Sequence, residues 1–305
     1  MKHVVVSLLN FNSKKNTLDC LKSLEDIRKD DFKLTIVIID NASKEDFGLK
    51  SKTVKDMSLV VIKNNENLGF SGGHNIAIRY ALDNRADYIL ILNNDTYVEK
   101  DFLTKLLKTA GEDRSVGILA PKIYFASGFE FHKDRYSKNE IGKVLWYAGG
   151  EMDWANVIGY NRGVDEVDNG QYDKAEETEV ATGCCMLIKK EVFENIGLFD
   201  DKYFLYYEDS DLSMRARRKD FKIMYVPSSV IWHKNAGSAG GSGSVLQDYY
   251  ITRNRLLFGF KFAAFLSKLA LFRESLSLFL RGRQWQKRGV IDFYLGKLGK
   301  GSYSV

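Results

Sequence analysis

Short apolar runs alternate with helical patterns in the first half of the chain, and this alternation constrains the fold more than any other feature. Buried strands are predicted at residues 4–9, 34–39, 59–62, 88–92 and 116–124. Between them, apolar residues at helical spacing predict helices near 18–27, 76–81 and 100–110. Such a series forms an α/β, Rossmann-like domain, with a mostly parallel sheet and helices on both faces.

The composition excludes several classes of protein. With 45% hydrophobic and 28% charged residues among its 305, the chain is neither disordered nor of low complexity. Three cysteines cannot build a disulfide scaffold, so a reduced compartment is expected. No apolar run has the length of a transmembrane helix, and the first residues do not resemble a signal peptide. A cytoplasmic protein is therefore expected.

The second half of the chain is less regular. Residues 126–178 are polar, aromatic and punctuated by glycine, with short strands that include one at 144–147. Regular patterns then return as predicted strands at 180–188, 222–226 and 229–233, and as predicted helices at 190–196 and about 206–219. Four glycines at 237–243 indicate a loop, either a lid over a ligand or a plain linker.

Polar side chains follow three of the predicted strands. They are Asn10 and Asn12 after the first strand, Asp40 and Asn41 after the second, and Asn93, Asn94 and Asp95 after the fourth. In a doubly wound sheet, ligands bind at the carboxyl ends of the strands. One such residue alone is usually a cap or a turn former, but several at one edge predict a binding site.

A glycine-rich segment, Asn67 to Asn75, precedes the helix near 76–81. Glycine permits close approach of the backbone, and the N–H groups of a helix start can bind an anion. The segment lacks both the Lys-Ser/Thr pair of a Walker loop and the spacing of a dinucleotide-binding loop. An anion-binding loop and a plain loop both remain open.

An acidic group opens the predicted helix that follows an aromatic run. Asp211 has Arg215 four residues further on, which predicts a structural ion pair. Glu208 and Asp209 are candidate catalytic residues, since burial in an aromatic-walled cleft raises the pKa of a carboxyl toward that of a general base. His233 ends a predicted strand and is either a structural hydrogen-bond donor or a metal ligand.

In this order and spacing, the motifs resemble those of glycosyltransferase family 2 enzymes with the GT-A fold, particularly the rhamnosyltransferase-like branch. The resemblance covers roughly residues 1–260 and rests on VSLLNFN, IIDNASKED, NENLGFSGGHN, LILNNDT, GLFDDKYFLYYEDSDLSMRARRKDFKI and YYITRNRLLF. It implies a catalytic domain at 1–243, with a donor half at about 1–125 and an acceptor half at about 126–243. A basic helical extension would follow at 244–305.

The resemblance also implies roles for single residues. Asp40 would bind the base or ribose of the donor nucleotide, in a pocket lined by Asn10 and Asn12. Asp209 would be the catalytic base and Glu208 its acidic neighbour. The other implied donor-site residues are Asn41, Gly69, Gly73, Asn75, Asn93, Asn94, Asp95 and Arg253.

Asp95 and His233 match the metal positions of the family, which implies Mg²⁺ or Mn²⁺ as the cofactor. Asp95 ends the family's D-x-D motif, but the first position here is Asn93, which leaves one charged ligand instead of two. The implied reaction is the inverting transfer of a sugar from a nucleoside diphosphate sugar of the dTDP-rhamnose or UDP-hexose type. Its acceptor would be a hydroxyl of a glycan or of a lipid-linked acceptor in cell-surface polysaccharide synthesis, such as that of O-antigen.

Two other functions stay open. A sugar-nucleotide pyrophosphorylase shares a Rossmann-like sheet, but it carries a glycine-rich loop with an arginine after the first strand, where this chain has NFNSKKN. The other is a non-catalytic nucleotide- or glycan-binding partner of another transferase.

The C-terminal region is basic and amphipathic. Residues 241–305 contain eleven Lys or Arg and three acids, whereas the rest of the chain is mildly acidic. At helical spacing, one face gathers Phe262, Phe265, Leu266, Leu269, Phe272, Leu276, Phe279 and Leu280. Residues 258–288 could contact the inner face of the cell membrane, dock on the domain, or form a homodimer. Nucleic acid is a disfavoured partner, because the basic residues interleave with an apolar face.

Overall fold

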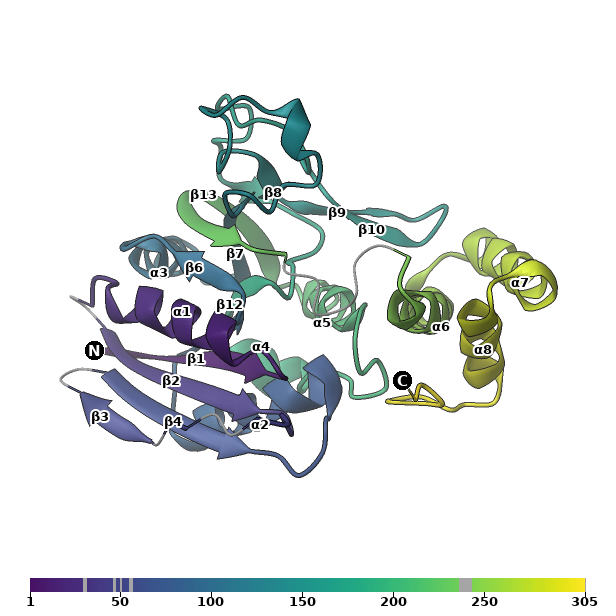
Figure 1. The fold of residues 1–305 in the computed structure, drawn as a ribbon, viewed down its shortest axis with the longest axis horizontal. Coiled ribbons are helices and arrows are strands. Elements are labelled where there is room, and N and C mark those ends of the chain that lie inside the picture. The colour runs from purple at the N-terminus through teal and green to yellow at the C-terminus, as the bar shows by residue number, and fades with distance from the viewer. Residues whose placement is uncertain (30–31, 46–47, 50, 55–56, 236–242, 305) are drawn as a thin grey trace.

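The computed structural model describes residues 1–29, 32–45, 48–49, 51–54, 57–235 and 243–304. An eleven-stranded mixed sheet forms its centre, with the order β11-β13-β7-β12-β5-β1-β2-β4-β3, while β6 pairs with β13 and β8 with β7 (Figure 1). Its strands are β1 (Lys2–Asn10), β2 (Phe32–Asp40), β3 (Lys52–Val54), β4 (Met57–Lys63), β5 (Tyr88–Asn93), β6 (Thr96–Val98), β7 (Val116–Phe125), β8 (Leu145–Tyr147), β11 (Glu176–Glu177), β12 (Cys185–Lys189) and β13 (Lys222–His233).

The predicted α/β fold class is confirmed. Parallel ladders join β4, β2, β1 and β5, as expected for buried β-branched strands, and β7 runs parallel to β13. Between these two parallel groups, β12 is antiparallel to both β5 and β7. The sheet is therefore mixed, and the antiparallel β12 connects its two halves.

Helices cover both faces of the sheet. They are α1 (Lys14–Glu25), α2 (Gly69–Asp83), α3 (Phe102–Glu112), α4 (Lys190–Ile196) and α5 (Glu208–Arg217). Of these, α1 and α3 lie on one face and α2 and α4 on the other (Figure 1). Leu24, Leu106 and Ala77 bury the inner faces of α1, α3 and α2 against the strands, which follows from their helical spacing.

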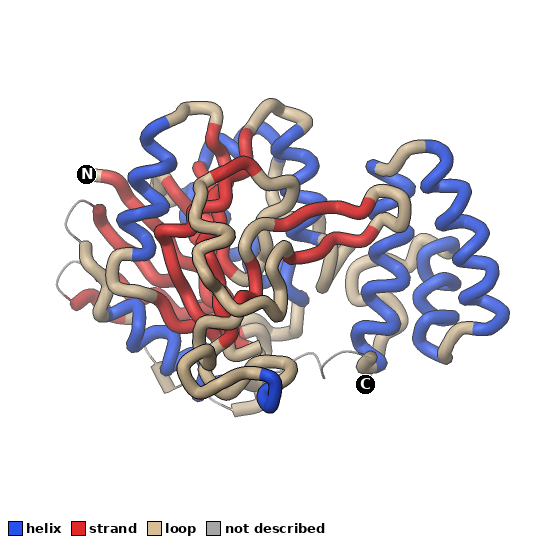
Figure 2. The backbone as a smooth tube through the Cα atoms, turned by 90° about the horizontal axis from the view of Figure 1, so that it is seen from above, coloured by secondary structure: helices blue, strands red, loops and turns tan. Residues whose placement is uncertain are grey.

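Two segments extend from the sheet and its covering helices. Residues 126–178 hold a short 3₁₀ helix (Lys133–Arg135) and a two-stranded antiparallel hairpin of β9 (Gly150–Asp153) and β10 (Ile158–Asn161). The C-terminal helices α6 (Val245–Phe262), α7 (Phe265–Arg281) and α8 (Gln284–Tyr294) form a separate layer at one end of the molecule (Figure 2). In the described part of the chain, we find no helix with the length and apolarity needed to cross a bilayer.

Three local predictions were wrong. The segment Asn67 to Asn75 is not a loop that precedes a helix, because α2 begins at Gly69. The strand predicted at 180–188 begins only at Cys185. The strands predicted at 222–226 and 229–233 are one strand, β13, whose register shifts between Val226 and Val230. The glycine-rich loop predicted at 237–243 lies outside the described residues except for Gly243.

Candidate active site

Strand register brings the predicted donor residues together at one edge of the sheet. Asn10 at the end of β1 is directly opposite Asp40 at the end of β2, and Leu9 is opposite Asn93 at the end of β5. Because these strands are parallel, their carboxyl ends meet at the same edge. The sequence therefore predicted correctly that these polar residues gather there.

A hydrogen-bond network holds the buried side chains of this edge. Asn10 Nδ2 donates to Asp40 Oδ1 at 3.2 Å and to Ser43 Oγ at 2.9 Å. Thr17 Oγ1, on α1, donates to Asn10 Oδ1 at 2.8 Å and accepts from Asn94 Nδ2 at 2.8 Å. The network fixes the orientation of the Asp40 carboxylate at the edge where a ligand would bind.

Asn12 reaches this network only through its backbone, whose N–H donates to Ser43 Oγ at 2.9 Å. It is an exposed residue with a positive φ of 51°, and its Oδ1 accepts from the backbone N–H of Lys44 at 2.8 Å. Its Asn side chain suits this left-handed conformation. Asn12 therefore orders the rim of the site, beside the loop that follows β2.

The glycines of the α2 segment act by close packing. A Cβ on Gly69, whose φ is +72°, would lie 2.3 Å from the carbonyl oxygen of Phe204, and a Cβ on Gly73 would lie 2.3 Å from Leu9 Cδ1. Asn75 Nδ2 donates to the carbonyl of Phe199 at 2.9 Å. Asn41 binds the same segment, because its Nδ2 donates to the carbonyl of Gly69 at 3.1 Å. These residues position the strand edge and the loop before α5.

Asp95 and His233 form a pair that could hold a metal ion. β6 pairs with the end of β13 so that His233 is opposite Thr96, and this register places His233 Nε2 3.1 Å from Asp95 Oδ1. Both residues are buried, and the rings of Trp146 and His233 pack edge to face, with their centroids 4.7 Å apart. A carboxylate oxygen is a ligand that suits Mg²⁺ and Mn²⁺, and an imidazole nitrogen is a ligand of transition-metal ions. The pair therefore fits a divalent cation with two protein ligands.

The pair alone does not complete the coordination of a divalent cation. Within the described ranges, no group of three or more His, Cys, Asp or Glu side chains is placed to hold a metal. Asn93, at the first position of the motif, carries no charge, as the sequence already indicated. Such a two-ligand site leaves coordination positions for phosphate oxygens and water.

Asp209, the predicted base, lies beside the carboxyl end of β5. Its Oδ2 accepts from the backbone N–H of Gly183 at 2.9 Å, and its Oδ1 accepts from that of Ser210 at 2.7 Å. Cys184, the residue after Gly183, accepts a hydrogen bond at 2.8 Å through its carbonyl from the backbone N–H of Asn93. Burial raises the pKa of the Asp209 carboxyl, and the two backbone N–H groups oppose that shift.

Glu208 differs from its neighbour in its surroundings. It is buried, and its Oε2 has no hydrogen-bond partner among the residues that the structure describes. Burial raises the pKa of Glu208 well above its ordinary value, and the charge of Asp209 adds to that shift. Asp211, by contrast, pairs with Arg215 at 2.5 Å, which confirms its predicted structural role.

The loop before α5 is held in an unfavourable backbone conformation. Phe204, Tyr206 and Tyr207 all have positive φ, at 63°, 69° and 71°. Such angles in non-glycine residues cost free energy and persist only where the surroundings impose them. Here Asn254 Nδ2, on α6, donates to the carbonyls of Tyr203, Leu205 and Tyr206 at 2.8, 2.7 and 2.9 Å.

Arg253 holds the same loop, and we call Arg253 and Asn254 together the clamp. It is fully buried, and its guanidinium donates to the carbonyls of Lys202 and Tyr203 at 3.2 and 3.0 Å. The guanidinium also lies over the aromatic rings of Tyr249 and Tyr250. The predicted donor contact of Arg253 does not agree with this burial, and we assign the residue to positioning the loop.

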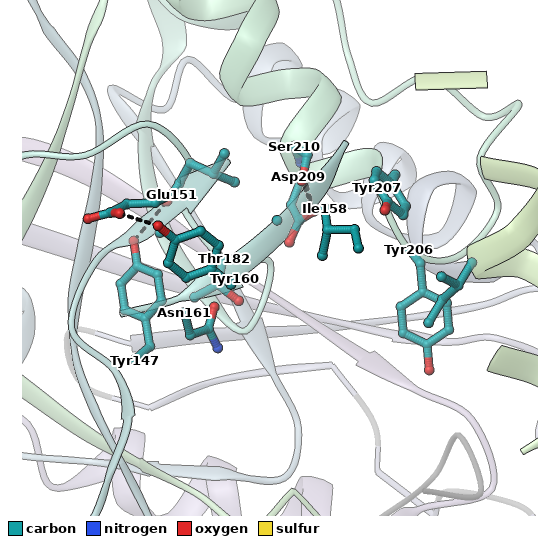
Figure 3. Close-up of a pocket in the computed structure, with 14 residues that line it drawn as sticks. Tyr147, Glu151, Ile158, Tyr160, Asn161, Thr182, Tyr206, Tyr207, Asp209 and Ser210 are labelled. Atoms are coloured by element: carbon teal, nitrogen blue, oxygen red, sulfur yellow. Dashed lines mark hydrogen bonds between the residues drawn. The ribbon is translucent and has the colours of Figure 1, made fainter. Parts of the chain in front are cut away.

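A pocket of about 260 Å³ opens in front of Asp209. The hairpin β9–β10 forms one wall and the loop before α5 forms the other, as Figure 3 shows. Tyr160 Oη donates to Glu151 Oε2 at 2.5 Å across the hairpin. The polar and aromatic residues of the lining are Tyr147, Glu151, Tyr160, Asn161, Thr182, Tyr206, Tyr207, Asp209 and Ser210.

The composition of this pocket limits what it can bind. Tyrosine rings, two carboxylates and an amide suit a molecule with several hydroxyl groups and an apolar ring face. No lysine or arginine is among the described residues that line it. A diphosphate is therefore a poor ligand for the pocket itself, whereas an uncharged sugar is a good one.

Sequence reasoning missed the hairpin and the clamp. Glu151 and Tyr160 lie in residues 126–178, where no period indicated this strand pair. Gly150 and Gly159 lie within its two strands, and the turn at 154–157 contains no glycine that could have marked it. Asn254 was part of a quoted motif, but its contacts with residues 203–206 are distant in the sequence. None of these three residues could be placed without the fold.

The comparisons with known proteins agree with this arrangement. The family model described as "Glycosyl transferase family 2" matches residues 5–197. The low-salt glycan biosynthesis hexosyltransferase Agl10 of Haloferax volcanii is 26% identical over 222 residues, which cover 72% of this chain and 66% of that protein. The dTDP-rhamnosyl transferase RfbF of Shigella flexneri is 22% identical over 232 residues, which cover 73% of this chain and 69% of that protein.

Among solved structures, the mannosyltransferase PcManGT of Pyrobaculum calidifontis, in complex with GDP-Man and Mn²⁺, matches with a TM-score of 0.57. The match has 14% identity and covers 99% of this chain and 76% of that one. At this identity it supports the fold alone. The chain spans just under two thirds of the length of the Haloferax protein.

Proposed function

The chain belongs to glycosyl transferase family 2, and from this premise we propose that it transfers a sugar, with inversion, from a nucleoside diphosphate sugar to an acceptor hydroxyl. We propose a donor of the dTDP-rhamnose or UDP-hexose type and an acceptor in cell-surface glycan synthesis, whether a glycan or a lipid-linked saccharide. The names of the relatives, a dTDP-rhamnosyl transferase and a glycan biosynthesis hexosyltransferase, support this choice.

One observation carries the proposal. The half-buried carboxylate of Asp209 lines a sugar-sized pocket and is joined through Gly183 and Cys184 to the strand end that bears Asn93 and Asp95. The proposed acceptor side and the proposed donor side of the reaction thus meet at the carboxyl end of β5. A plain binding module has no need for a carboxyl of raised pKa at this junction.

The proposed mechanism assigns the proton to Asp209. As the acceptor oxygen forms its bond to the anomeric carbon, the bond from that carbon to the diphosphate oxygen breaks, and the hydroxyl proton moves to the Asp209 carboxylate. Because the acceptor attacks from the side opposite the diphosphate, the anomeric configuration inverts. The raised pKa of Asp209 makes its carboxylate a stronger base than an exposed aspartate.

On the donor side, Asp40 and Asn10 would bind the nucleoside, and Asn94 would lie at the same edge. Asp95 and His233 would hold Mg²⁺ or Mn²⁺, which, when bound, neutralises charge on the leaving diphosphate. A lipid-linked acceptor would place the reaction at the cytoplasmic face of a membrane. Donor, acceptor, metal and location are all parts of this proposal.

The first experiment measures thermal stabilisation by UDP, dTDP, GDP and CDP, each with and without Mn²⁺. A ligand at about 100 times its Kd adds about 2.7 kcal/mol to the free energy of unfolding, which a melting curve resolves. We expect metal-dependent stabilisation by dTDP or UDP, and release of that nucleotide from its sugar donor when acceptors are added. If no nucleotide shifts the melt, the donor proposal fails and a non-catalytic binding role takes its place.

A further inference from the structure

The outer face of α7 is apolar and exposed. Its side chains there are Phe265, Leu266, Phe272, Leu276, Phe279 and Leu280, and the first two are each 77% exposed. They recur at helical spacing along the whole helix, so they form one continuous stripe. Single exposed apolar residues are ordinary on a protein surface, but a continuous stripe of this size marks an interaction site.

The opposite face of α7 already docks on the protein. Leu271 and Ser275 are buried there, and Leu271 packs so closely on α6 that a Cβ on Gly259 would lie 2.2 Å from its Cδ1. Ser275 Oγ lies 2.8 Å from the hydroxyl of Tyr294, at the end of α8. Docking within the chain therefore accounts for this inner face, and the apolar stripe has another use.

Cations surround the stripe without acidic partners. Lys268, Arg273 and Arg281 on α7 form no ion pair with any described residue. Glu274, the acid of this helix, is bound by Arg255 at 2.6 Å.

The other two acids of the helical layer are also engaged. Asp248 pairs with Arg283, and Asp292 lies 3.4 Å from Arg288. The outer face of the layer is therefore apolar and positively charged.

The stripe could be covered by a second copy of this chain or by a lipid surface, and charge decides between them. In a symmetric dimer, the same patch of two copies would meet, which would place Arg273 and Lys268 of one copy near those of the other. The acids that could relieve this repulsion are engaged elsewhere. An anionic lipid surface complements the cations and accepts the apolar side chains at once.

We propose that the stripe on α7 binds the surface of an anionic bilayer. The helix lies along the interface with Phe265, Leu266 and Phe272 inserted among the lipids, while Lys268, Arg273 and Arg281 extend to the headgroups. This contact is peripheral. It is independent of which sugar or nucleotide the protein uses.

Vesicle flotation tests the proposal on the full chain. We expect the protein to float with vesicles of equal parts phosphatidylglycerol and phosphatidylcholine, and about tenfold less with phosphatidylcholine alone. Raising the salt from about 0.1 M to about 1 M, which shortens the Debye length from about 10 Å to about 3 Å, weakens the binding. The double variant F265S/L266S lowers the bound fraction about tenfold while its melting temperature stays unchanged.

Phe131→Ser is the matched control, because Phe131 is also exposed, at 56%, but lies in the segment 126–178, outside the helical layer. It should float like the unaltered protein. Failure of the unaltered protein to float with anionic vesicles overturns the proposal, and so does flotation that F265S/L266S leaves intact. A dimer that F265S/L266S converts to a monomer in light scattering assigns the stripe to a second copy and also overturns it.

Discussion

At the scale of single residues, Asp209 is the most direct test of the chemistry. Asp209→Asn keeps the shape of the side chain but removes the proton acceptor, so turnover should fall about 10²- to 10⁴-fold. Thermal stabilisation by nucleotide and Mn²⁺ should persist, because the nucleoside residues lie at the ends of β1 and β2 and not on α5. Nucleotide release with a panel of p-nitrophenyl glycosides as acceptors measures the rate. Loss of nucleotide binding in this variant would instead indicate a structural role for Asp209.

Glu208 gives a second prediction, which concerns stability. The folded pKa of its carboxyl is raised, while in the unfolded chain it titrates near its ordinary value of about 4.3. Between these two pKa values the unfolded chain has released the proton and the folded chain retains it. The free energy of unfolding therefore falls as pH rises through this window.

Glu208→Gln cannot ionise, so it escapes this loss. We expect the variant to be more stable than the unaltered protein at neutral pH, and the gain to shrink as the pH approaches 4. Urea unfolding at several pH values measures both differences. A gain that is the same at every pH would show that titration of Glu208 does not cause it.

At the scale of elements, the β9–β10 hairpin should decide acceptor binding. Tyr160 covers one side of the pocket and binds Glu151, so Tyr160→Ala removes both a ring and a hydroxyl from the wall. The KM for the acceptor should rise about tenfold, whereas slow hydrolysis of the donor by water should not change. Tyr160→Phe separates the ring from the hydroxyl. An altered donor KM with an unaltered acceptor KM would contradict this assignment.

Helix α6 should act on catalysis through the loop before α5. Asn254→Ala removes the amide that binds three loop carbonyls, and leaving such groups unpaired costs about 1–3 kcal/mol. We expect kcat to fall while nucleotide binding is kept, because the loop leads directly into the start of α5, where Asp209 lies, and holds none of the nucleoside residues. Asn84→Ala is the control, since Asn84 also bonds a carbonyl but at the exposed end of α2. Equal loss of kcat in both variants would argue against the clamp.

The sequence predicted the elements whose signal is local and missed those that depend on distant contacts. Apolar runs placed β1, β2 and β5, and the parallel register then explained why Asn10 and Asp40 meet. The start of α2 was misjudged, because Gly69 and Gly73 are needed for packing against Phe204 and Leu9, which lie far away in the chain. For the same reason the clamp by Arg253 and the hairpin wall could not be foreseen. The amphipathic stripe was visible, but only the fold shows which face of α7 is exposed.

At the scale of the whole molecule, the Asp95–His233 pair joins the two halves of the chain. Asp95 follows β5 in the first half and His233 ends β13 in the second, so a bound cation would link them. Mn²⁺ should therefore raise the melting temperature further when nucleotide is present. In Asp95→Asn this metal-dependent increment should disappear, while stabilisation by nucleotide alone and the response of the control Asp83→Asn remain. If Mn²⁺ still raises the melting temperature of Asp95→Asn, the cation binds elsewhere. The uncharged Asn93 would then indicate a donor site that works without a metal between Asp95 and His233.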